Sequence, residues 1–482
     1  MGKQLVFLTF ALLFSSALST SPGLEVTISE GVLSNAWQAG VKVALPHLQS
    51  LSIPKTSGKT KTSVGTFAYS VSDIKVTKLK CKSTSAKLKS GEGVDLSASG
   101  LTLTVTLKFS FKEESWPHIK TGASATVKVK DGSATLVGLP SSTKDGHLRL
   151  SLSKRSVSLG DFDISVDGSM SWLHNFVESL FKSEIKSECE KEIESAIDGQ
   201  IPQLNTYLAS LPTQYAIDMW QGSTVTVDYS VVNPPTITSS FMFLDALGGF
   251  SVDGKAKSCP YKAPAMPQVA SGSDVQVYVA DYVENCFLYS LHEGGLLTTT
   301  IDDSMVPSSS PIHLNTTDLQ GLEPNLYAAY PNMLVEIVVR STAAPTVHNT
   351  VNTTQISAPI ALDWYAVLEN GTNAFAFTLE SNAQMSIDVE VSINADGNIF
   401  VTGTLQESSI VFTATKSDIG DVAVAGLNGL VQLGMQLGQT FLNKGYVVPP
   451  VNVKNVGNLQ FSNPTIQLQE GYALASINAD IP

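Results

Sequence analysis

The chain has 482 residues, of which 43% are hydrophobic and 15% are charged. This composition excludes a disordered protein, and the length favours two or more domains. The formal charge of −13 conceals an asymmetry, because residues 42–155 carry 19 Lys or Arg against 7 Asp or Glu, whereas residues 251–482 carry 7 against 21. The basic part predicts an anion-binding surface, and the alternative is a solvated, lysine-rich sheet edge that blunts aggregation.

The first residues have the pattern of a secretory signal peptide. Lys3 precedes an apolar stretch from Leu5 to Phe14, and the small residues Ala17 and Ser19 suit a signal peptidase. An apolar run of about 10 residues is too short to cross a membrane core that needs about 20. We therefore expect residues 1–20 to be removed, with cleavage near residues 19–21, and the mature protein to be secreted.

The first half predicts a helix, a set of strands and a longer helix. Residues 28–51 place apolar side chains at three- and four-residue spacing, which predicts a helix that Pro46 ends or bends. A second amphipathic helix is expected over residues 171–211, broken near Pro202, with a glutamate-rich face in solvent. Period-two alternation between them predicts half-buried antiparallel strands over residues 65–77, 94–111, 123–137, 147–159 and 161–166.

The second half repeats this order. A strand-like region over residues 223–252 and a proline-bearing linker from Cys259 to Pro267 precede it. Residues 275–280 predict a strand, and residues 281–293 predict a helix with an Asp281 cap and a glycine end. A last helix is expected over residues 417–443, whose several glycines indicate a close backbone approach or space for a ligand. Further strands are expected over residues 333–341, 356–368, 374–380, 384–393, 398–405, 451–456 and 465–477.

A curved sheet wrapped on a long helix can leave an apolar channel between the two. Burial of an acyl chain there is favourable by about 0.8 kcal/mol per CH₂, whereas the alternative is a channel that closes as a packed core. The residues that we expect to line such a lipid tunnel are Leu33, Trp37, Val41, Leu173, Phe176, Val177, Leu180, Val283, Phe287, Leu291, Leu427, Leu430 and Val431.

The sequence offers no catalytic or metal-binding pattern. The seven histidines are scattered, the cysteines form no CxxC pair, and no HExxH, GxSxG or Walker-type loop is present. The carboxylate pairs Glu113-Glu114 and Asp302-Asp303 lie in turn-like sequence, where we expect them to be solvated. We therefore expect no enzyme, no metal and no cofactor. A secreted hydrolase, suggested only by exposed carboxylates, is the catalytic alternative.

Covalent modification is predicted at two kinds of residue. Asn315, Asn352 and Asn370 each begin an Asn-X-Thr triplet in turn-like sequence, which predicts N-glycosylation in a secreted protein. Four cysteines in an oxidising compartment allow two disulfides in three pairings, among which the sequence does not choose, and buried free thiols are the alternative. These cysteines are Cys81, Cys189, Cys259 and Cys286.

An ordered set of motifs resembles the family of bactericidal/permeability-increasing protein, lipopolysaccharide-binding protein and the plasma lipid-transfer proteins. The set spans nearly the whole mature chain. It comprises SPGLEV from Ser21 with Ile28-Ser29, Ile53-Pro54, VADYV from Val279, HEGGLL from His292, DDSMVP from Asp302, YPNM from Tyr330, NPTI from Asn463 and EGY from Glu470.

This resemblance implies an α+β fold of two pseudo-duplicated barrels, elongated and boomerang-like, each a curved antiparallel sheet wrapped on long helices, joined by a central sheet. The implied parts are a signal peptide (1–20), an N-terminal lipid-binding barrel (21–235), a central sheet and proline-bearing linker (236–272) and a C-terminal lipid-binding barrel (273–482). The family pairs the position of Cys189 with a strand cysteine that is absent here near Leu150–Ser153. Cys189 would then pair with Cys81 or stay free, and Cys286 would meet Cys259.

The resemblance also implies a function. In the members that bind lipopolysaccharide, basic residues at the tip of the N-terminal barrel engage lipid A. It implies a secreted, monomeric protein that binds lipopolysaccharide or a similar anionic glycolipid, at a bacterial outer membrane or on lipid particles, in antibacterial innate defence. The alternative is a phospholipid or neutral-lipid carrier or transfer protein without endotoxin specificity; nucleic acid is not an expected partner. The residues at the equivalent turns here are Lys55, Lys59, Lys61, Lys108, Lys112, Lys120 and Lys144. Glu113 and Glu114 partly offset the positive charge of the middle group, Lys108, Lys112 and Lys120.

Overall fold

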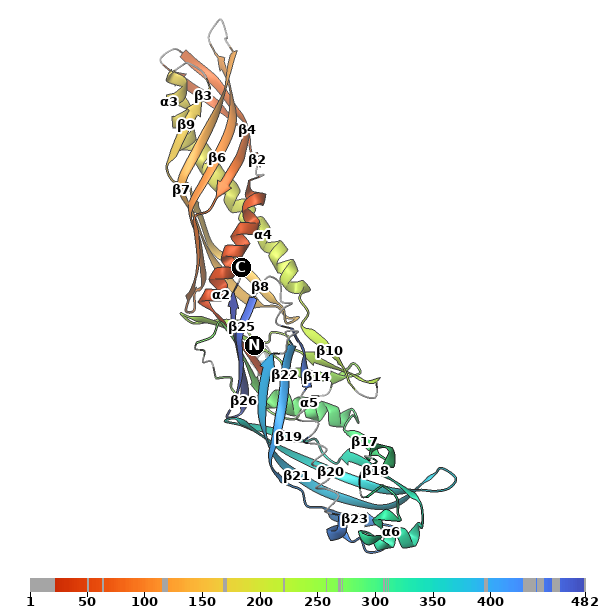
Figure 1. Cartoon of the computed structure of the whole chain (residues 1–482). Coiled ribbons are helices and arrows are strands. Elements are labelled where there is room, and N and C mark those ends of the chain that lie inside the picture. Colours follow the sequence, from red (N-terminus) through yellow and green to blue (C-terminus); the bar gives the residue numbers. More distant parts are fainter. Residues whose placement is uncertain are drawn as a thin grey trace, which may run out of the picture. The chain divides into compact units, whose positions relative to one another are not determined.

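The computed structural model contains two compact units (Figure 1). Unit 1 comprises Met1–Val26, Thr213–Asn233 and Asp245–Asn478, and unit 2 comprises Thr27–Pro212, Pro234–Leu244 and Ala479–Pro482. The predicted signal peptide lies outside the described residues. The structure describes residues 22–480 except 50–51, 63–64, 115–119, 168–170, 220–221, 257, 268–269, 271, 307, 309, 311, 394–397, 428–438, 440–445 and 453–459.

Curled antiparallel sheets with few helices make this an α+β fold, as the sequence predicted. In unit 2 the sheet order is β2-β4-β6-β7-β8, with β3 paired to β4, β5 to β6 and β9 to β7. The sequence missed β3 and β5, because these short, lysine-bearing segments lack an apolar residue at every second position. The strands are β2 (Ser52–Ile53), β3 (Thr56–Thr62), β4 (Gly65–Lys80), β5 (Ser83–Lys89), β6 (Gly93–Glu113), β7 (Lys120–Ser142), β8 (Leu148–Ser158) and β9 (Phe162–Val166).

Two helical segments accompany this sheet. Helix α2 (Glu30–Leu48) starts two residues later than predicted, because Leu24–Ser29 form strand β1. The second segment is continuous and consists of α3 (Ser171–Leu180), a π-helical turn η1 (Phe181–Ile185) and α4 (Lys186–Ser210), which Figure 1 shows as one long rod. Pro202 lies inside α4 without ending it, so the predicted break is wrong.

The core of unit 2 lies between the sheet and this long helix. The inward side chains of β4, β6 and β7 are buried, and Phe111 and Phe181 are fully inaccessible to solvent. The Phe176 ring packs edge-on against Tyr69, Phe109 and Phe111, with centroids 5.3–6.5 Å apart. Burial of a large apolar side chain contributes about 1.5–3 kcal/mol, so this cluster fixes the helix on the sheet.

Polar side chains of α4 bind the edge of β8. The Glu190 and Glu194 carboxylates accept hydrogen bonds from the backbone N–H groups of Leu159 and Val157, at 2.8 and 2.9 Å. The Asn205 amide accepts from the N–H of Leu150 at 2.8 Å and donates to its carbonyl at 2.9 Å. The prediction that the glutamate-rich face is solvated is therefore only partly right, because two of its glutamates accept hydrogen bonds from backbone N–H groups.

Replacing Asn205 with Ala is expected to lower the free energy of unfolding by about 1–3 kcal/mol, because two hydrogen bonds are lost and the half-buried N–H and carbonyl groups of Leu150 lose their side-chain partner. Urea denaturation followed by circular dichroism measures the change. The exposed neighbour Gln203 provides the control, and Gln203→Ala is expected to have little effect. An equal loss in both variants would show that the Asn205 bonds carry no stability of their own.

Unit 1 contains a large sheet with the order β17-β18-β20-β21-β22-β24, to which β19 adds through β20 and β23 through β21. A small sheet has the order β10-β11-β14-β15, and β16 pairs with β26, which pairs with β25. A turn at Glu470–Gly471 divides the predicted strand 465–477 into β25 and β26. The strands of these sheets are β10 (Gln214–Asp218), β11 (Thr224–Asp228), β14 (Gly249–Val252), β15 (Lys255–Ala256), β16 (Val275–Ala280), β17 (Thr298–Ile301), β18 (Leu334–Ser341), β19 (Thr346–Thr350), β20 (Thr353–Val367), β21 (Asn373–Ile393), β22 (Asn398–Ser409), β23 (Thr413–Ser417), β24 (Tyr446–Asn452), β25 (Gln460–Gln469) and β26 (Tyr472–Asp480).

Two other groups of elements are short. Strands β1, β12 (Thr236–Ile237) and β13 (Phe241–Ala246) lie where the chain passes between the units. The described part of unit 1 also has short helical turns that the sequence did not predict, because they are shorter than the window in which helical periodicity can be read. These turns are η3 (Asp303–Met305), η4 (Asp318–Gly321) and α6 (Pro324–Ala329).

Helix α5 (Asp281–Glu293) has the predicted bounds and ends at Gly294 and Gly295, the latter with a φ of 71°. Asp281 does not cap it, because the cap position is Ala280 and the Asp281 carboxylate binds elsewhere. A disulfide joins Cys286 of α5 to Cys259, in the pairing that was expected. Cys81 and Cys189 are free, so of the two alternatives for Cys189 the free thiol is confirmed and the pairing with Cys81 is wrong. Burial raises the pKa of the Cys189 thiol to about 12, which keeps it protonated and unreactive.

The predicted helix 417–443 starts later than expected. Strand β23 ends at Ser417, and helical residues begin at 424. The Cα of Gly426 faces the Leu322 carbonyl so closely that a Cβ there would lie 2.4 Å from its oxygen. Close backbone approach therefore explains this glycine, although the neighbour is a loop and not a sheet. Gly429, Gly434 and Gly438 lie outside the described residues.

Candidate functional site: a lysine face and the apolar interiors

The outer face of the unit 2 sheet carries lysines and hydroxyl residues. Along β4 the buried residues Ile74, Val76 and Leu79 alternate with the exposed lysines 75, 78 and 80. Strands β6 and β7 show the same alternation, with their apolar residues inward. We call this surface the lysine face. It comprises Lys59, Lys61, Lys75, Lys78, Lys80, Lys108, Lys112, Lys120 and Lys128, with Ser70, Ser72, Thr102, Thr104, Thr106, Ser110, Ser124 and Thr126 between them.

Strand register places two of these lysines directly opposite each other. Lys59 is paired with Ala68, Ala68 with Lys112, and Lys112 with Lys120, so that one row of the face holds three lysines. Like charges at directly opposite positions of an antiparallel pair destabilise a sheet. The Lys112–Lys120 pair therefore has a structural cost that an anionic ligand would remove.

Two lysines of the face have acidic partners. Lys59 lies 2.7 Å from the Glu114 carboxylate, and Lys108 lies 3.0 Å from that of Asp73. The hydrogen bond and charge of Lys108 lower the pKa of Asp73. Both pairs are well exposed, so each contributes little to stability. Within the described part of the chain, the other lysines of the face form no ion pair within 4.0 Å, and the face is strongly positive.

Four of the predicted head-group lysines lie together at one end of the lysine face, because Lys59, Lys112 and Lys120 share a row at the ends of β6 and β7 and Lys61 lies near the end of β3. Lys59 and Lys61 lie on β3, and Lys108, Lys112 and Lys120 lie on strands of the lysine face, although turns were expected. Lys55 follows β2, opposite the irregularity at Ser72 to Lys75 in β4. Lys144 lies in the turn after β7, at the other end of that strand from Lys120, or roughly 70 Å along the chain at about 3.3 Å per residue. Lys144 is therefore separate from the others.

Sequence reasoning missed four lysines of this face as site residues. Lys75, Lys78, Lys80 and Lys128 enter the sequence analysis only through the basic charge of residues 42–155. The signal that could have found them is their position on the polar side of strands with period-two alternation, since this puts them on one surface.

The predicted tunnel residues of unit 2 separate into a helix surface and a core. Val177 and Leu180 are buried in the core, with Phe176 packed against them. Leu33, Trp37 and Val41 lie half-buried on α2, where the Trp37 indole donates to the Ser97 carbonyl at 2.8 Å. The Leu173 side chain lies outside the described part.

In unit 1 the predicted tunnel residues again divide. Leu291 is buried against β11 and β14, and the Phe287 and Phe250 rings lie 5.2 Å apart, so α5 covers the small sheet. Val283 lies beside Gly23 and Gly248. Leu427 joins the core of the large sheet with Trp364 and Phe377. Leu430 and Val431 lie outside the described residues, so the tunnel itself stays a prediction.

A groove of about 610 Å³ lies between α4 and β8 in unit 2. Its lining combines the apolar residues Leu150, Leu152 and Ile201 with polar ones that include Arg149, Arg155, Asp198 and Asn205. Arg155 is paired with Asp198 at 3.1 Å, whereas Arg149 is exposed. The groove is open and its lining is more polar than apolar, so it does not have the character of an enclosed lipid tunnel.

The three predicted glycosylation sites differ in exposure. Asn352 and Asn370 are exposed in turns of unit 1. Asn315 is half-buried, and its side-chain oxygen accepts from the N–H of Asp318 at 2.8 Å. Asn352 and Asn370 are therefore the more accessible to a glycosyltransferase.

In the described part of the chain no helix has both the length and the apolar character needed to cross a membrane. The described residues also contain no group of three or more His, Cys, Asp or Glu side chains that is placed to hold a metal ion.

Comparisons with known proteins match both halves of the chain. The model of the LBP / BPI / CETP family N-terminal domain matches residues 32–205, and that of the C-terminal domain matches residues 221–480. A bactericidal permeability-increasing protein of Sebastes schlegelii is 24% identical over 477 residues, covering 97% of each chain. A lipopolysaccharide-binding protein of Bos taurus is 24% identical over 476 residues, covering 96% of this chain and 95% of its own.

A solved structure agrees with these matches at the level of the fold. The crystal structure of lipopolysaccharide binding protein superimposes with a TM-score of 0.60 at 20% identity, covering 96% of this chain and 99% of the other. Because the two domain models together span most of the described residues in the expected order, this chain belongs to the LBP / BPI / CETP family.

Proposed function

We propose that this protein is a secreted, non-catalytic lipid-binding protein that docks on anionic lipid or glycolipid through the lysine face. Bacterial lipopolysaccharide, which several relatives are named for binding, is the ligand that we propose, in antibacterial defence. The observation that carries the proposal is the opposed pair Lys112 and Lys120, with Lys59 in the same row and Lys108 further along β6. Phosphate groups spaced along a glycolipid surface would neutralise several of these rows together.

The proposed docking mode differs from a single contact at the barrel tip. The lysine face extends over β3, β4, β6 and β7, and hydroxyl groups lie between its lysines. Hydroxyl and ammonium groups together can donate hydrogen bonds to phosphate and sugar oxygens. We infer that the head groups lie against this face, while acyl chains occupy apolar space elsewhere in the protein.

Vesicle binding at two salt concentrations tests this proposal. Binding of the full chain to vesicles with anionic head groups is expected to weaken about ten-fold or more between about 50 and 300 mM NaCl, because the lysines are exposed and screening shortens their reach below about 10 Å. Vesicles of phosphatidylcholine alone serve as the control and are expected to bind weakly at both concentrations. Equal binding to both vesicle types, unaffected by salt, would refute docking through the lysine face.

A lipid carrier without endotoxin specificity is the second candidate, and membership of the LBP / BPI / CETP family supports it. Organic extraction of natively purified protein, followed by mass spectrometry, separates the two candidates. Neutral lipid or zwitterionic phospholipid in the extract, together with salt-insensitive vesicle binding, would favour the carrier. Phosphorylated glycolipid captured from a defined mixture would favour the proposed function.

A further inference from the structure

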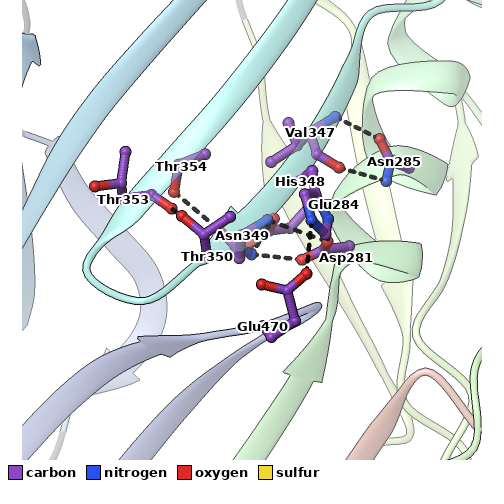
Figure 2. Close-up of polar contacts among 10 residues, drawn as sticks. All are labelled: Asp281, Glu284, Asn285, Val347, His348, Asn349, Thr350, Thr353, Thr354 and Glu470. Carbon is purple, nitrogen blue, oxygen red and sulfur yellow. Dashed lines mark hydrogen bonds and ion pairs between the residues drawn. The ribbon is translucent and has the colours of Figure 1, made fainter.

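One histidine of unit 1 lies between two carboxylates from separate elements (Figure 2). His348 of β19 places its Nδ1 2.8 Å from the Asp281 carboxylate in the first turn of α5. Its Nε2 lies 3.1 Å from the carboxylate of Glu470, in the turn between β25 and β26. These three residues are separated by 67 and 122 positions in the sequence, so the contacts join distant segments.

Neighbouring hydrogen bonds join the same three segments. The Asn349 amide donates to both the Asp281 and the Glu284 carboxylates, each at 2.8 Å, and its side-chain oxygen accepts from Thr354. The N–H of Asp281 donates to the carbonyl of Gly471, and the N–H of Gly471 donates to that of Asn349. Figure 2 shows these side chains converging on the start of α5. A change in charge here therefore acts on α5, β19 and the β25–β26 turn together.

The geometry favours a charged imidazole. A neutral imidazole carries one N–H, whereas both ring nitrogens of His348 face carboxylate oxygens, and only imidazolium donates from both. The hydrogen bond to Asp281 raises the pKa of His348, with Glu470 adding to the effect. Deprotonation would leave a nitrogen lone pair facing a carboxylate.

A second acid beside Asn349 titrates near neutrality. Glu284 is largely buried, which raises its pKa to about 7, and the Asp281 charge acts in the same direction. The acidic groups that face His348 are Asp281 from α5 and Glu470 from the turn, whereas Glu284 of α5 contacts the neighbouring Asn349. No Lys or Arg in the described part of unit 1 forms an ion pair with any of the three.

We propose that Asp281, His348 and Glu470 form a pH-sensitive clasp that holds β19 and the β25–β26 turn against α5 below neutral pH and releases them as the pH rises. Release would loosen the end of the large sheet at β19 and β20. The proposal is independent of the lipid that the protein binds. It needs only the contacts within unit 1.

The pH dependence has one direction for both groups. Because the pKa of His348 is raised in the folded state, its contribution is complete below the unfolded pKa and disappears as the pH rises through the folded pKa. Because the pKa of Glu284 is also raised, its ionised form is disfavoured in the folded state, and this cost appears as the pH rises above the unfolded value. Both groups therefore predict that the clasp weakens from mildly acidic to alkaline pH.

Hydrogen exchange of the full chain, read by mass spectrometry and corrected for the intrinsic pH dependence, tests the clasp. Between about pH 5.5 and about pH 8.5, protection in peptides covering residues 345–352 and 466–473 is expected to fall about ten-fold or more. In His348→Gln the low protection is expected at both pH values, because Gln cannot become an imidazolium. Unchanged protection of the wild-type peptides, or an undiminished fall in His348→Gln, would overturn the proposal.

Two further variants keep the result interpretable. His313→Gln is the matched control, since it removes a histidine of unit 1 whose Nδ1 also faces a carboxylate, that of Asp303, and it is expected to leave the fall unchanged. Glu470→Gln changes only an exposed turn residue and is expected to fold even where His348→Gln does not. In Glu470→Gln the pH-dependent loss of hydrogen-exchange protection is expected to be smaller than in the wild type. A loss equal to that of the wild type would contradict a role for Glu470 in the clasp.

Discussion

Reversing Lys112 and Lys120 together to Glu is expected to lower the affinity for anionic vesicles about a hundred-fold or more at low salt. Each positive charge near an anionic surface contributes about 1 kcal/mol, so a change of four charge units corresponds to about 4 kcal/mol before screening. The folded state is expected to tolerate the change, because one opposed like-charge pair replaces another. Vesicle flotation at about 50 mM salt measures the affinity, and thermal unfolding measures the stability.

A charge-matched variant separates the lysine face from net charge alone. Lys154→Glu with Lys191→Glu makes the same change in net charge on β8 and α4, away from the lysine face. It is expected to lose only a few-fold in affinity through the overall field. If both double variants bind equally poorly, the position of the lysines has no importance and the lysine face is not the docking surface.

Removing the Cys259–Cys286 disulfide is expected to lower the free energy of unfolding of unit 1 by about 3 kcal/mol. The bond closes a loop of 27 residues, and crosslinks of this span act mainly by restricting the unfolded chain. The double variant Cys259→Ala, Cys286→Ala is expected to fold, since Leu291 and Phe287 still bind α5 to the small sheet. Urea denaturation followed by circular dichroism gives the difference.

Reductant supplies the internal check on this prediction. Dithiothreitol is expected to lower the stability of the wild type to that of the double variant and to leave the double variant unchanged. Cys81→Ala removes a thiol that forms no disulfide and serves as the control. A wild type that is equally stable with and without reductant would show that the crosslink is absent or contributes nothing.

Much of the fold could be predicted because its elements carry their own periodicity. Strand β6 alternates apolar and polar residues over most of its length, and α5 has both a helical spacing and a Gly294–Gly295 end. Strands β3 and β5 could not be found in this way, because they are held by pairing to long neighbours and bury few apolar side chains. Tertiary pairing supplies the stability that local sequence does not indicate.

The candidate site was less predictable, because it depends on register and on long-range contacts. The lysines were visible in the sequence, but the opposition of Lys112 and Lys120 follows from how β6 and β7 align. Lys144 was grouped with them by family resemblance, and the length of β7 separates it. His348 was one of seven scattered histidines, and nothing local connects it to Asp281 or Glu470.

The side-chain amide of Asn205 has a counterpart in unit 1. Asn285 of α5 accepts from the N–H of Val347 at 2.7 Å and donates to its carbonyl at 2.9 Å, as Asn205 does with Leu150. In each unit the carboxamide thus makes the two hydrogen bonds that the backbone of an adjacent strand would otherwise make to that edge. A strand of another molecule would have to displace a packed helix before it could add to β8 or β19. The covered edges of β8 and β19 therefore protect the long sheets of this protein from edge-to-edge association with other molecules.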